Sequence, residues 1–203
     1  MTIKPGFFKR VKALDFQQKK VFAIALCQRM LPNYQLFSQV CEFGDPQILD
    51  TVLNLLWQSC YDQKLKLNID IYLERLELNT PDASDFDVYG VYPAMDASTA
   101  LISLLSAIQG KVEEDMVNIS KLSSSTVANY IEAISDVDVG MDEDAFDDYI
   151  FNHEVMVEEK TLQDYLLQLI EDAPKLDAGF IKALRTEIIE AGVSNIGIAT
   201  PEV

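Results

Sequence analysis

Apolar side chains recur along most of the chain at spacings of three and four residues, which is typical of amphipathic helices. The first predicted helix covers residues 15–31 and ends at Pro32, because proline has no backbone N–H to continue the hydrogen-bond ladder. A short helix over residues 34–41 follows. We expect Asp45 to cap a third helix, over residues 46–57, which is apolar on nearly all sides and should therefore be central to the core.

The middle of the chain contains one ambiguous segment and three helical ones. Residues 65–71 alternate between apolar and polar side chains like a strand, but helical spacing resumes at once, so we predict a helix from about Asn68. An apolar helix is expected over residues 93–110. Two short amphipathic helices, over residues 112–119 and 127–134, follow it, separated by serines that can act as N-caps.

The last third of the chain is also helical in pattern. One apolar stripe contains His153 and ends near Val157, so we expect this histidine to be packed or partly buried. The phase of the pattern then changes, and Thr161 can cap a new helix. The final helix is the best marked, with Asp177 at its N-cap and Gly192 at its end.

These segments together predict an all-α fold. No alternation of strands and helices and no internal repeat occurs in the 203 residues, a length that suits one domain. We predict a single helical bundle over residues 1–203 with roughly seven to nine helices, a basic N-terminal segment (1–13) and a C-terminal tail (194–203). The tail packs back onto the domain or meets a partner, and the sequence does not decide between the two. No segment approaches the ~20 consecutive apolar residues of a membrane span.

Charge is distributed unevenly. The chain has 33 acidic and 16 basic residues, a net charge of −17, but residues 1–30 hold seven of the bases and one acid. Such an acidic surface repels nucleic acid and anionic membranes. We expect the basic segment to dock against the protein's own acidic body or against a second copy. A nucleic-acid accessory role for this segment is a third, weaker hypothesis.

The cysteines favour a cytoplasmic protein. Cys27, Cys41 and Cys60 are odd in number, widely spaced and without a C-x-x-C pair, so we expect reduced and mostly buried thiols. The single histidine does not complete a Cys/His zinc site by itself. Neither a G-x-S-x-G motif nor either of the common glycine-rich phosphate-binding motifs is present, and no cofactor is expected.

One cluster of carboxylates is a candidate metal site. Asp85, Asp87 and Asp96 stand at positions 1, 3 and 12 of a calcium-binding loop pattern, with Asp82 just before them. The pattern departs from an EF-hand, because Tyr89 takes the place of an oxygen ligand. The candidate ligands of a looser divalent-metal site are therefore Asp82, Asp85, Asp87 and Asp96. The alternative is a turn in which these side chains cap backbone N–H groups.

A second acidic run extends over residues 136–159, with ten acids and no Lys or Arg. Its first part, residues 142–144, suits the N-terminus of a helix. Five later acids of the run are expected on a solvated face rather than in a ligand set: Asp147, Asp148, Glu154, Glu158 and Glu159.

Structural rather than catalytic roles are expected for several glycine and aromatic residues. We expect Gly44 and Gly90 to adopt turn conformations that are closed to side chains. The expected core anchors are Tyr34, Phe37, Trp57 and Tyr92. For the last of these an alternative stays open, namely a pocket lined by Tyr89 and Tyr92.

Several of these blocks together resemble a known family. The sequence around Pro32-Asn33-Tyr34, the segment from Asp85 to Ala94, and residues 191–198 are similar to the YjaG-like family of uncharacterised bacterial proteins. The resemblance covers residues 14–198. It implies a cytosolic, mostly helical protein and assigns no catalytic residues.

Two hypotheses about function follow. The absence of catalytic motifs and the segregation of charge favour a non-enzymatic interaction or regulatory protein that binds a protein partner or forms a homodimer. The alternative is a divalent-metal-binding protein or metal-dependent enzyme that uses the loop from Asp82 to Asp96.

Overall fold

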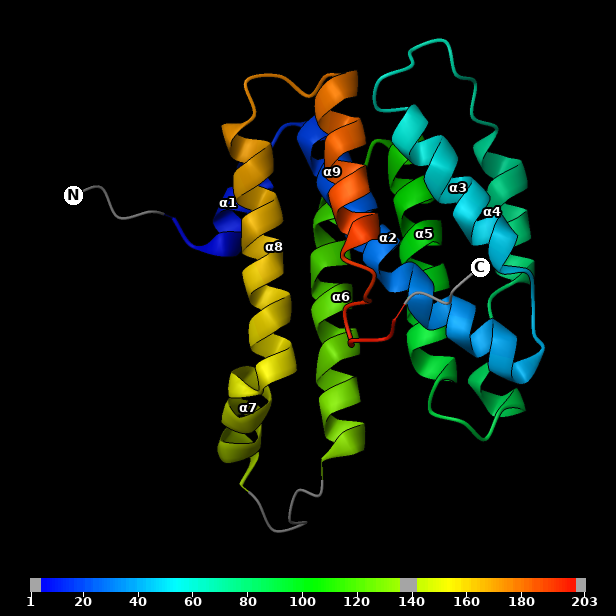
Figure 1. The fold of residues 1–203 in the computed structure, drawn as a ribbon, viewed down its shortest axis with the longest axis vertical. Helices are drawn as coiled ribbons and strands as arrows, with labels where there is room; N and C mark the ends of the chain where they lie inside the picture. Colours follow the sequence, from blue (N-terminus) through cyan, green and yellow to red (C-terminus); the bar gives the residue numbers. More distant parts are fainter. Residues whose placement is uncertain (1–4, 136–141, 200–203) are drawn as a thin grey trace.

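Helices form almost all of the regular structure in the computed structural model, which describes residues 5–135 and 142–199 (Figure 1). Within these ranges there are nine α-helices, one short 3-10 helix (η1) and no β-strand, so the all-α prediction is confirmed. The parts of the predicted basic segment, acidic run and tail at residues 1–4, 136–141 and 200–203 lie outside the described residues. The elements are α1 (Phe7–Ala13), α2 (Phe16–Cys41), α3 (Pro46–Gln58), α4 (Ile69–Leu78), η1 (Ala83–Asp85), α5 (Val91–Gly110), α6 (Glu113–Ile134), α7 (Glu143–Asn152), α8 (Glu154–Asp172) and α9 (Ala178–Glu190).

The central helix is α2, which packs against α3, α5, α6, α8 and α9. The prediction that it ends at Pro32 is wrong. Proline costs about 3 kcal/mol inside a helix, but the turn beyond it buries Tyr34 and Phe37, each worth about 1.5–3 kcal/mol. Burial therefore outweighs the lost hydrogen bond, and the helix continues to Cys41. The predicted central position of the next helix, α3, is also wrong, because α3 buries only one face.

The prediction of two short helices over residues 112–119 and 127–134 is wrong, because one long helix, α6, covers both. Its serines do not cap a new helix. Ser120 and Ser123 are fully buried and donate hydrogen bonds to Gln163 and Glu159 on α8. Partners on another helix thus satisfy hydroxyl groups that would otherwise favour a helix end.

The break between α7 and α8 falls at His153 rather than at Thr161. The imidazole Nδ1 of His153 accepts the backbone N–H of Val155, so the partly buried histidine is the N-cap of α8. Thr161 lies inside α8, where its hydroxyl donates to the carbonyl of Val157.

Aspartate caps begin several helices as predicted. Asp45 accepts the N–H of Gln47, with proline at the first position of α3. Asp177 caps α9 in the same manner, and Asp142 caps α7. These side chains satisfy N–H groups that have no partner inside the helix. Gly192, with φ of +66°, follows the end of α9.

The two glycine predictions differ in outcome. Gly44 has φ of +66°, and a Cβ there would collide with the hydroxyl of Tyr34, so the prediction is confirmed. Gly90 has φ of −53°, and a Cβ there would make only an ordinary van der Waals contact with Phe37 at 3.9 Å, so the prediction is wrong for this residue. It precedes α5 in ordinary helical conformation, which any residue can adopt.

Helix α5 is the most apolar element. It is long and apolar enough to cross a membrane by length and composition, and 56% of that window is buried inside the protein. It packs against α2, α4 and α6. These contacts are those of a core helix, so its hydropathy has a structural explanation.

The core contains three of the four predicted aromatic anchors. Trp57, Tyr34 and Phe37 are buried, but the prediction is wrong for Tyr92, whose side chain is 51% exposed. The tail from Ser194 packs back onto the protein, and Ile196 joins a small apolar cluster with residues of α6 and α8. Of the two alternatives for the tail, the structure therefore shows the first.

Candidate functional site

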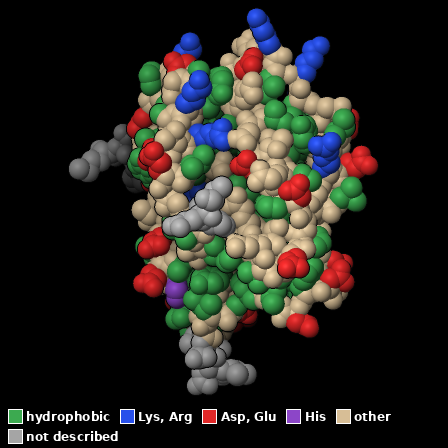
Figure 2. All heavy atoms as spheres, turned by 45° about the vertical axis from the view of Figure 1, so that its right-hand side comes forward, with side chains coloured by type: hydrophobic (Ala, Val, Ile, Leu, Met, Phe, Trp, Pro, Cys, Tyr) green, Lys and Arg blue, Asp and Glu red, His purple; other side chains and the backbone are tan. Residues whose placement is uncertain are grey.

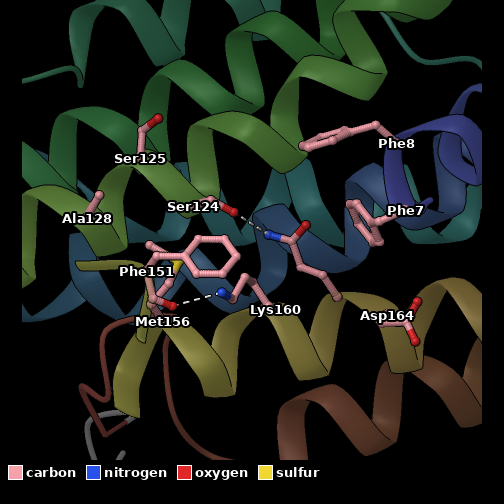
Figure 3. A pocket seen from close by; sticks show the side chains of 10 residues that line it. Phe7, Phe8, Ser124, Ser125, Ala128, Phe151, Met156, Lys160 and Asp164 are labelled. Atoms are coloured by element: carbon pink, nitrogen blue, oxygen red, sulfur yellow. Dashed lines mark hydrogen bonds between the residues drawn. The ribbon is translucent and has the colours of Figure 1, made fainter. Parts of the chain in front are cut away.

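An apolar groove lies between α1, α6, α7 and α8, with a volume of about 510 Å³. The side chains that form its apolar surface are Phe7 and Phe8 from α1, Ala128 from α6, Phe151 from α7 and Met156 from α8, as Figure 3 shows. We call this surface the phenylalanine groove. Phe8 and Phe151 are 45% and 59% exposed, so the groove is open to a partner.

Lys160 is the cation within the groove. Its ammonium group donates to the carbonyl of Phe151 at 2.8 Å and lies over the ring of the same residue (Figure 3). Burial lowers the pKa of Lys160. The alkyl chain of Lys160 covers apolar surface, while its ammonium group interacts with the carbonyl and the ring of Phe151.

Ion pairs hold α1 in place on one side of the groove. The guanidinium of buried Arg10 pairs with Asp164 and, at 2.6 Å, with Glu171, both on α8. Lys12 of α1 pairs with Glu114 of α6 at 3.2 Å. A helix of seven residues is not stable by itself, so these contacts to α6 and α8 fix the position of Phe7 and Phe8. Of the two alternatives for the basic segment, its described part therefore shows the first, docking on the protein's own acidic body.

A buried polar network lies beneath the groove. Gln163 lines the groove and donates to Glu159 Oε1 at 2.6 Å. Glu159 has no exposed side-chain area and pairs with Arg29 of α2, while Ser123 of α6 donates to it at 2.6 Å. Asn195 donates to the Ser123 carbonyl at 3.1 Å and so ties the tail to α6. The prediction that Glu159 lies on a solvated face is therefore wrong.

The candidate metal ligands lie at the turn before α5 and on α5 itself. Asp82 accepts the N–H and the hydroxyl of Ser84, both at 2.8 Å, and these bonds lower its pKa. Asp96 accepts the hydroxyl of Thr126 at 2.7 Å, and burial raises the pKa of Asp96.

Asp85 and Asp87 of the same loop are exposed. In the part of the chain that the structure describes, no group of three or more His, Cys, Asp and Glu side chains is arranged to hold a metal ion. Asp82 instead caps a backbone N–H, as the turn alternative expects, and metal binding by these carboxylates is the alternative hypothesis.

The phenylalanine groove was missed in the sequence because its members are distant along the chain. Phe7 and Phe8 lie in a segment notable for its charge, and Phe151 in a run notable for its acids. The one feature of the sequence that could have indicated the groove is Phe151, a large apolar residue beside an acidic helical face. Only the docking of α1 through Arg10 brings the phenylalanines to one groove.

Comparisons with known proteins identify the family. Residues 6–199 match the family model described as "Protein of unknown function (DUF416)". The chain is 37% identical over 190 residues to the "Uncharacterized protein YjaG" of Escherichia coli (strain K12), covering 93% of this chain and 94% of the relative. It is 35% identical over 192 residues to an "Uncharacterized protein" of Haemophilus influenzae, covering 94% and 95%.

A solved structure has the same fold. The crystal structure of a DUF416 family protein from Shewanella baltica OS155, at 1.91 Å resolution, aligns with a TM-score of 0.92 and 69% sequence identity. The alignment covers 97% of this chain and all of the other. The resemblance noted in the sequence is thereby confirmed, and the chain belongs to the DUF416 family of bacterial proteins that includes YjaG.

Proposed function

We propose that the protein is a non-enzymatic cytoplasmic interaction protein, which binds an amphipathic helix of a partner protein in the phenylalanine groove. The observation that carries this proposal is the groove itself, an open apolar hollow with two phenylalanine rings at its surface, Phe8 and Phe151. Grooves of this kind bind helices that insert apolar side chains at positions i, i+3, i+4 and i+7.

Acidic side chains beside the groove favour a partner helix with basic side chains. On α7, Asp144 and Asp147 stand seven and four residues before Phe151, so all three lie on one helix face. In the described ranges, no Lys or Arg forms an ion pair with these two exposed acids. The opposite end of the groove has Lys121 over the ring of Phe8. A complementary helix therefore carries Lys or Arg beside α7 and continues as an apolar stripe toward α1.

The wider surface supports a basic partner. On the face shown in Figure 2, most Lys and Arg side chains lie in the upper part, among scattered Asp and Glu, whereas the charged side chains of the lower part are Asp and Glu, with a histidine at the edge. With a net charge of −17, long-range attraction speeds the encounter with a positively charged protein segment. A second copy of this chain has the same acidic character, and this disfavours self-association at α7.

The thiols support a cytoplasmic location. All three cysteines are free. Burial raises the pKa of the Cys60 thiol to about 11 and also raises that of Cys27. Unpaired thiols, of which Cys27 and Cys60 are buried and therefore unreactive, are typical of proteins kept in a reducing compartment.

Fluorescence anisotropy tests the proposal. The probe is a labelled helical peptide of about four turns with Leu on one face and Lys on the other, compared with a peptide in which Glu replaces Lys. We expect the Leu/Lys peptide to bind at least tenfold more tightly. Phe151→Ser and Asp147→Lys should each weaken its binding, the former by about tenfold or more as at an interface hot spot. The matched controls on α4, Leu78→Ser and Glu77→Lys, should leave it unchanged.

Either of two kinds of result would overturn this function. One kind comes from the peptide assay, namely equal binding of the two peptides or binding that Phe151→Ser does not weaken. The other is a dimer of the protein alone, seen by light scattering, that Phe151→Ser converts to a monomer, because the occupant of the groove would then be a second copy.

A further inference from the structure

A second hollow, which we call the tyrosine hollow, lies between the start of α5 and the end of α6. Figure 1 shows these two helix ends at the lower end of the molecule. It has a volume of about 300 Å³ and is lined by Tyr89, Tyr92, Asn129, Glu132 and Ala133. This volume is at the lower end of the range for small-molecule sites. The hollow is separate from the phenylalanine groove and is not part of the function proposed above.

Three tyrosine rings surround this part of the surface. The rings of Tyr89 and Tyr92 have centroids 5.8 Å apart at an interplanar angle of 48°, and those of Tyr89 and Tyr130 are 6.3 Å apart at 47°. Tyr92 is 51% exposed, so its ring stands at the open side. The faces of aromatic rings carry negative potential and attract organic cations.

Carboxylates near the tyrosine rings make the electrostatic potential of the hollow more negative. Glu132 lines the hollow, and Asp96 lies one helical turn after Tyr92 on α5. Burial, together with the charge of Asp96, raises the pKa of Tyr89 to about 12. Helix α5 contains no Lys or Arg, and α6 contains none after Lys121. The last turn of α6 contributes a further partial negative charge.

The hydroxyl oxygen of Tyr89, a residue that lines the hollow, is buried, and no residue of the described chain forms a hydrogen bond with it. Buried polar atoms without a partner are rare in native proteins. A ligand with an N–H group near the rings would give the Tyr89 oxygen a donor.

We propose that the tyrosine hollow binds an alkylguanidinium or alkylammonium ion, with its charge against the rings of Tyr89 and Tyr92 and its N–H groups toward Glu132 and the Tyr89 hydroxyl. A free small molecule and an exposed Arg or Lys side chain of another protein present the same group. A divalent metal ion fits the hollow less well, because it requires about six oxygen ligands and Glu132 is the one carboxylate that lines it.

Calorimetric titration of the full chain tests this inference. The probes are butylguanidinium, butylammonium and the neutral butylurea, which has the shape of butylguanidinium without its charge. We expect both cations to bind and butylurea not to bind. Acetylarginine methylamide serves as a model of a protein side chain. If it binds more tightly than butylguanidinium, the source is a protein side chain, and if it does not, the source is a small molecule.

Variants at exposed positions locate the binding. Tyr92→Leu and Glu132→Gln should each weaken butylguanidinium binding by about fivefold or more, the size of one aromatic or ionic contact. Tyr165→Leu, a substitution of a similarly exposed tyrosine on α8, should leave it unchanged. All three side chains are exposed, so the variants are expected to fold, and thermal melting confirms this.

Three results would overturn the inference. These are the absence of cation binding at millimolar concentration, equal binding of butylurea, and an affinity that Tyr92→Leu does not lower. None of them bears on the peptide assay of the phenylalanine groove, so the failure of one proposal is distinguishable from the failure of the other.

Discussion

The ion pair between Arg29 and Glu159 provides the sharpest test of how the core is held together. Glu159 has no exposed side-chain area and Arg29 has 11%, so the carboxylate is buried and its partner is largely buried. Arg29→Met removes the cation and leaves a buried carboxylate with only Ser123 and Gln163 as hydrogen-bond partners. Removing one partner of a buried pair costs about 3–5 kcal/mol. For a chain of this size, that loss lowers the melting temperature by roughly 6–20 °C.

The assay is urea unfolding followed by the fluorescence of Trp57, which is the only tryptophan and is buried. Lys12→Met is the matched control, because Lys12 and Glu114 form an ion pair with both side chains more than half exposed. We expect a loss below about 1 kcal/mol for this control. The double variant Arg29→Met/Glu159→Gln removes both charges and should recover part of the stability lost in Arg29→Met.

A loss for Arg29→Met as small as that of Lys12→Met would refute the reasoning, since the carboxylate would then have access to water. A double variant less stable than Arg29→Met would refute it as well. In that case the hydrogen bonds of Glu159, rather than its unpaired charge, would dominate the energy of the network.

Three further predictions use the same unfolding assay or thermal melting. Gly44→Ala should destabilise the protein by about 2 kcal/mol or more, because of its positive φ and the collision with Tyr34, whereas Gly90→Ala should change stability by less than about 0.5 kcal/mol. Burial raises the pKa of Asp96 above its unfolded value of 3.8, so ionisation destabilises the fold as pH rises above that value. Asp96→Asn should therefore be more stable than the wild type at pH 7, with the difference shrinking toward pH 4. Addition of Ca²⁺, Mg²⁺ or Mn²⁺ to chelator-treated protein should not raise the melting temperature, and a rise that Asp85→Asn abolishes would contradict this and establish the loop as a metal site.

Helix ends could be predicted where the signal is local. Asp45 and Asp177 act as caps because an Asx side chain reaches an N–H two or three residues ahead, whatever surrounds it. Gly44 was recognised for the same kind of reason, since its turn needs a positive φ. These features depend on a few neighbouring residues, and the sequence contains all of them.

Features decided by distant partners could not be predicted. Pro32 ends a helix by local rules, but the burial of Tyr34 in the core keeps α2 continuous. Ser123 and Glu159 resemble a cap and a surface acid until α6 and α8 pack together and bond them to each other. The candidate site follows the same division, because the phenylalanine groove depends on the docking of α1 through Arg10.

The two proposed binding surfaces share α6, which raises the question of whether they communicate. Ala128 lines the phenylalanine groove and the next residue, Asn129, lines the tyrosine hollow. On either side of this pair along the helix, Val127 and Ile131 fix this part of α6 in the apolar cluster with Met156. Coupling of two sites requires an element with two arrangements that both ligands bias. A helix anchored in this way presents one arrangement, so we expect the affinity of the Leu/Lys peptide to be the same with and without saturating butylguanidinium. A change beyond about threefold would show that the helix moves, and would make α6 an allosteric connection rather than a shared scaffold.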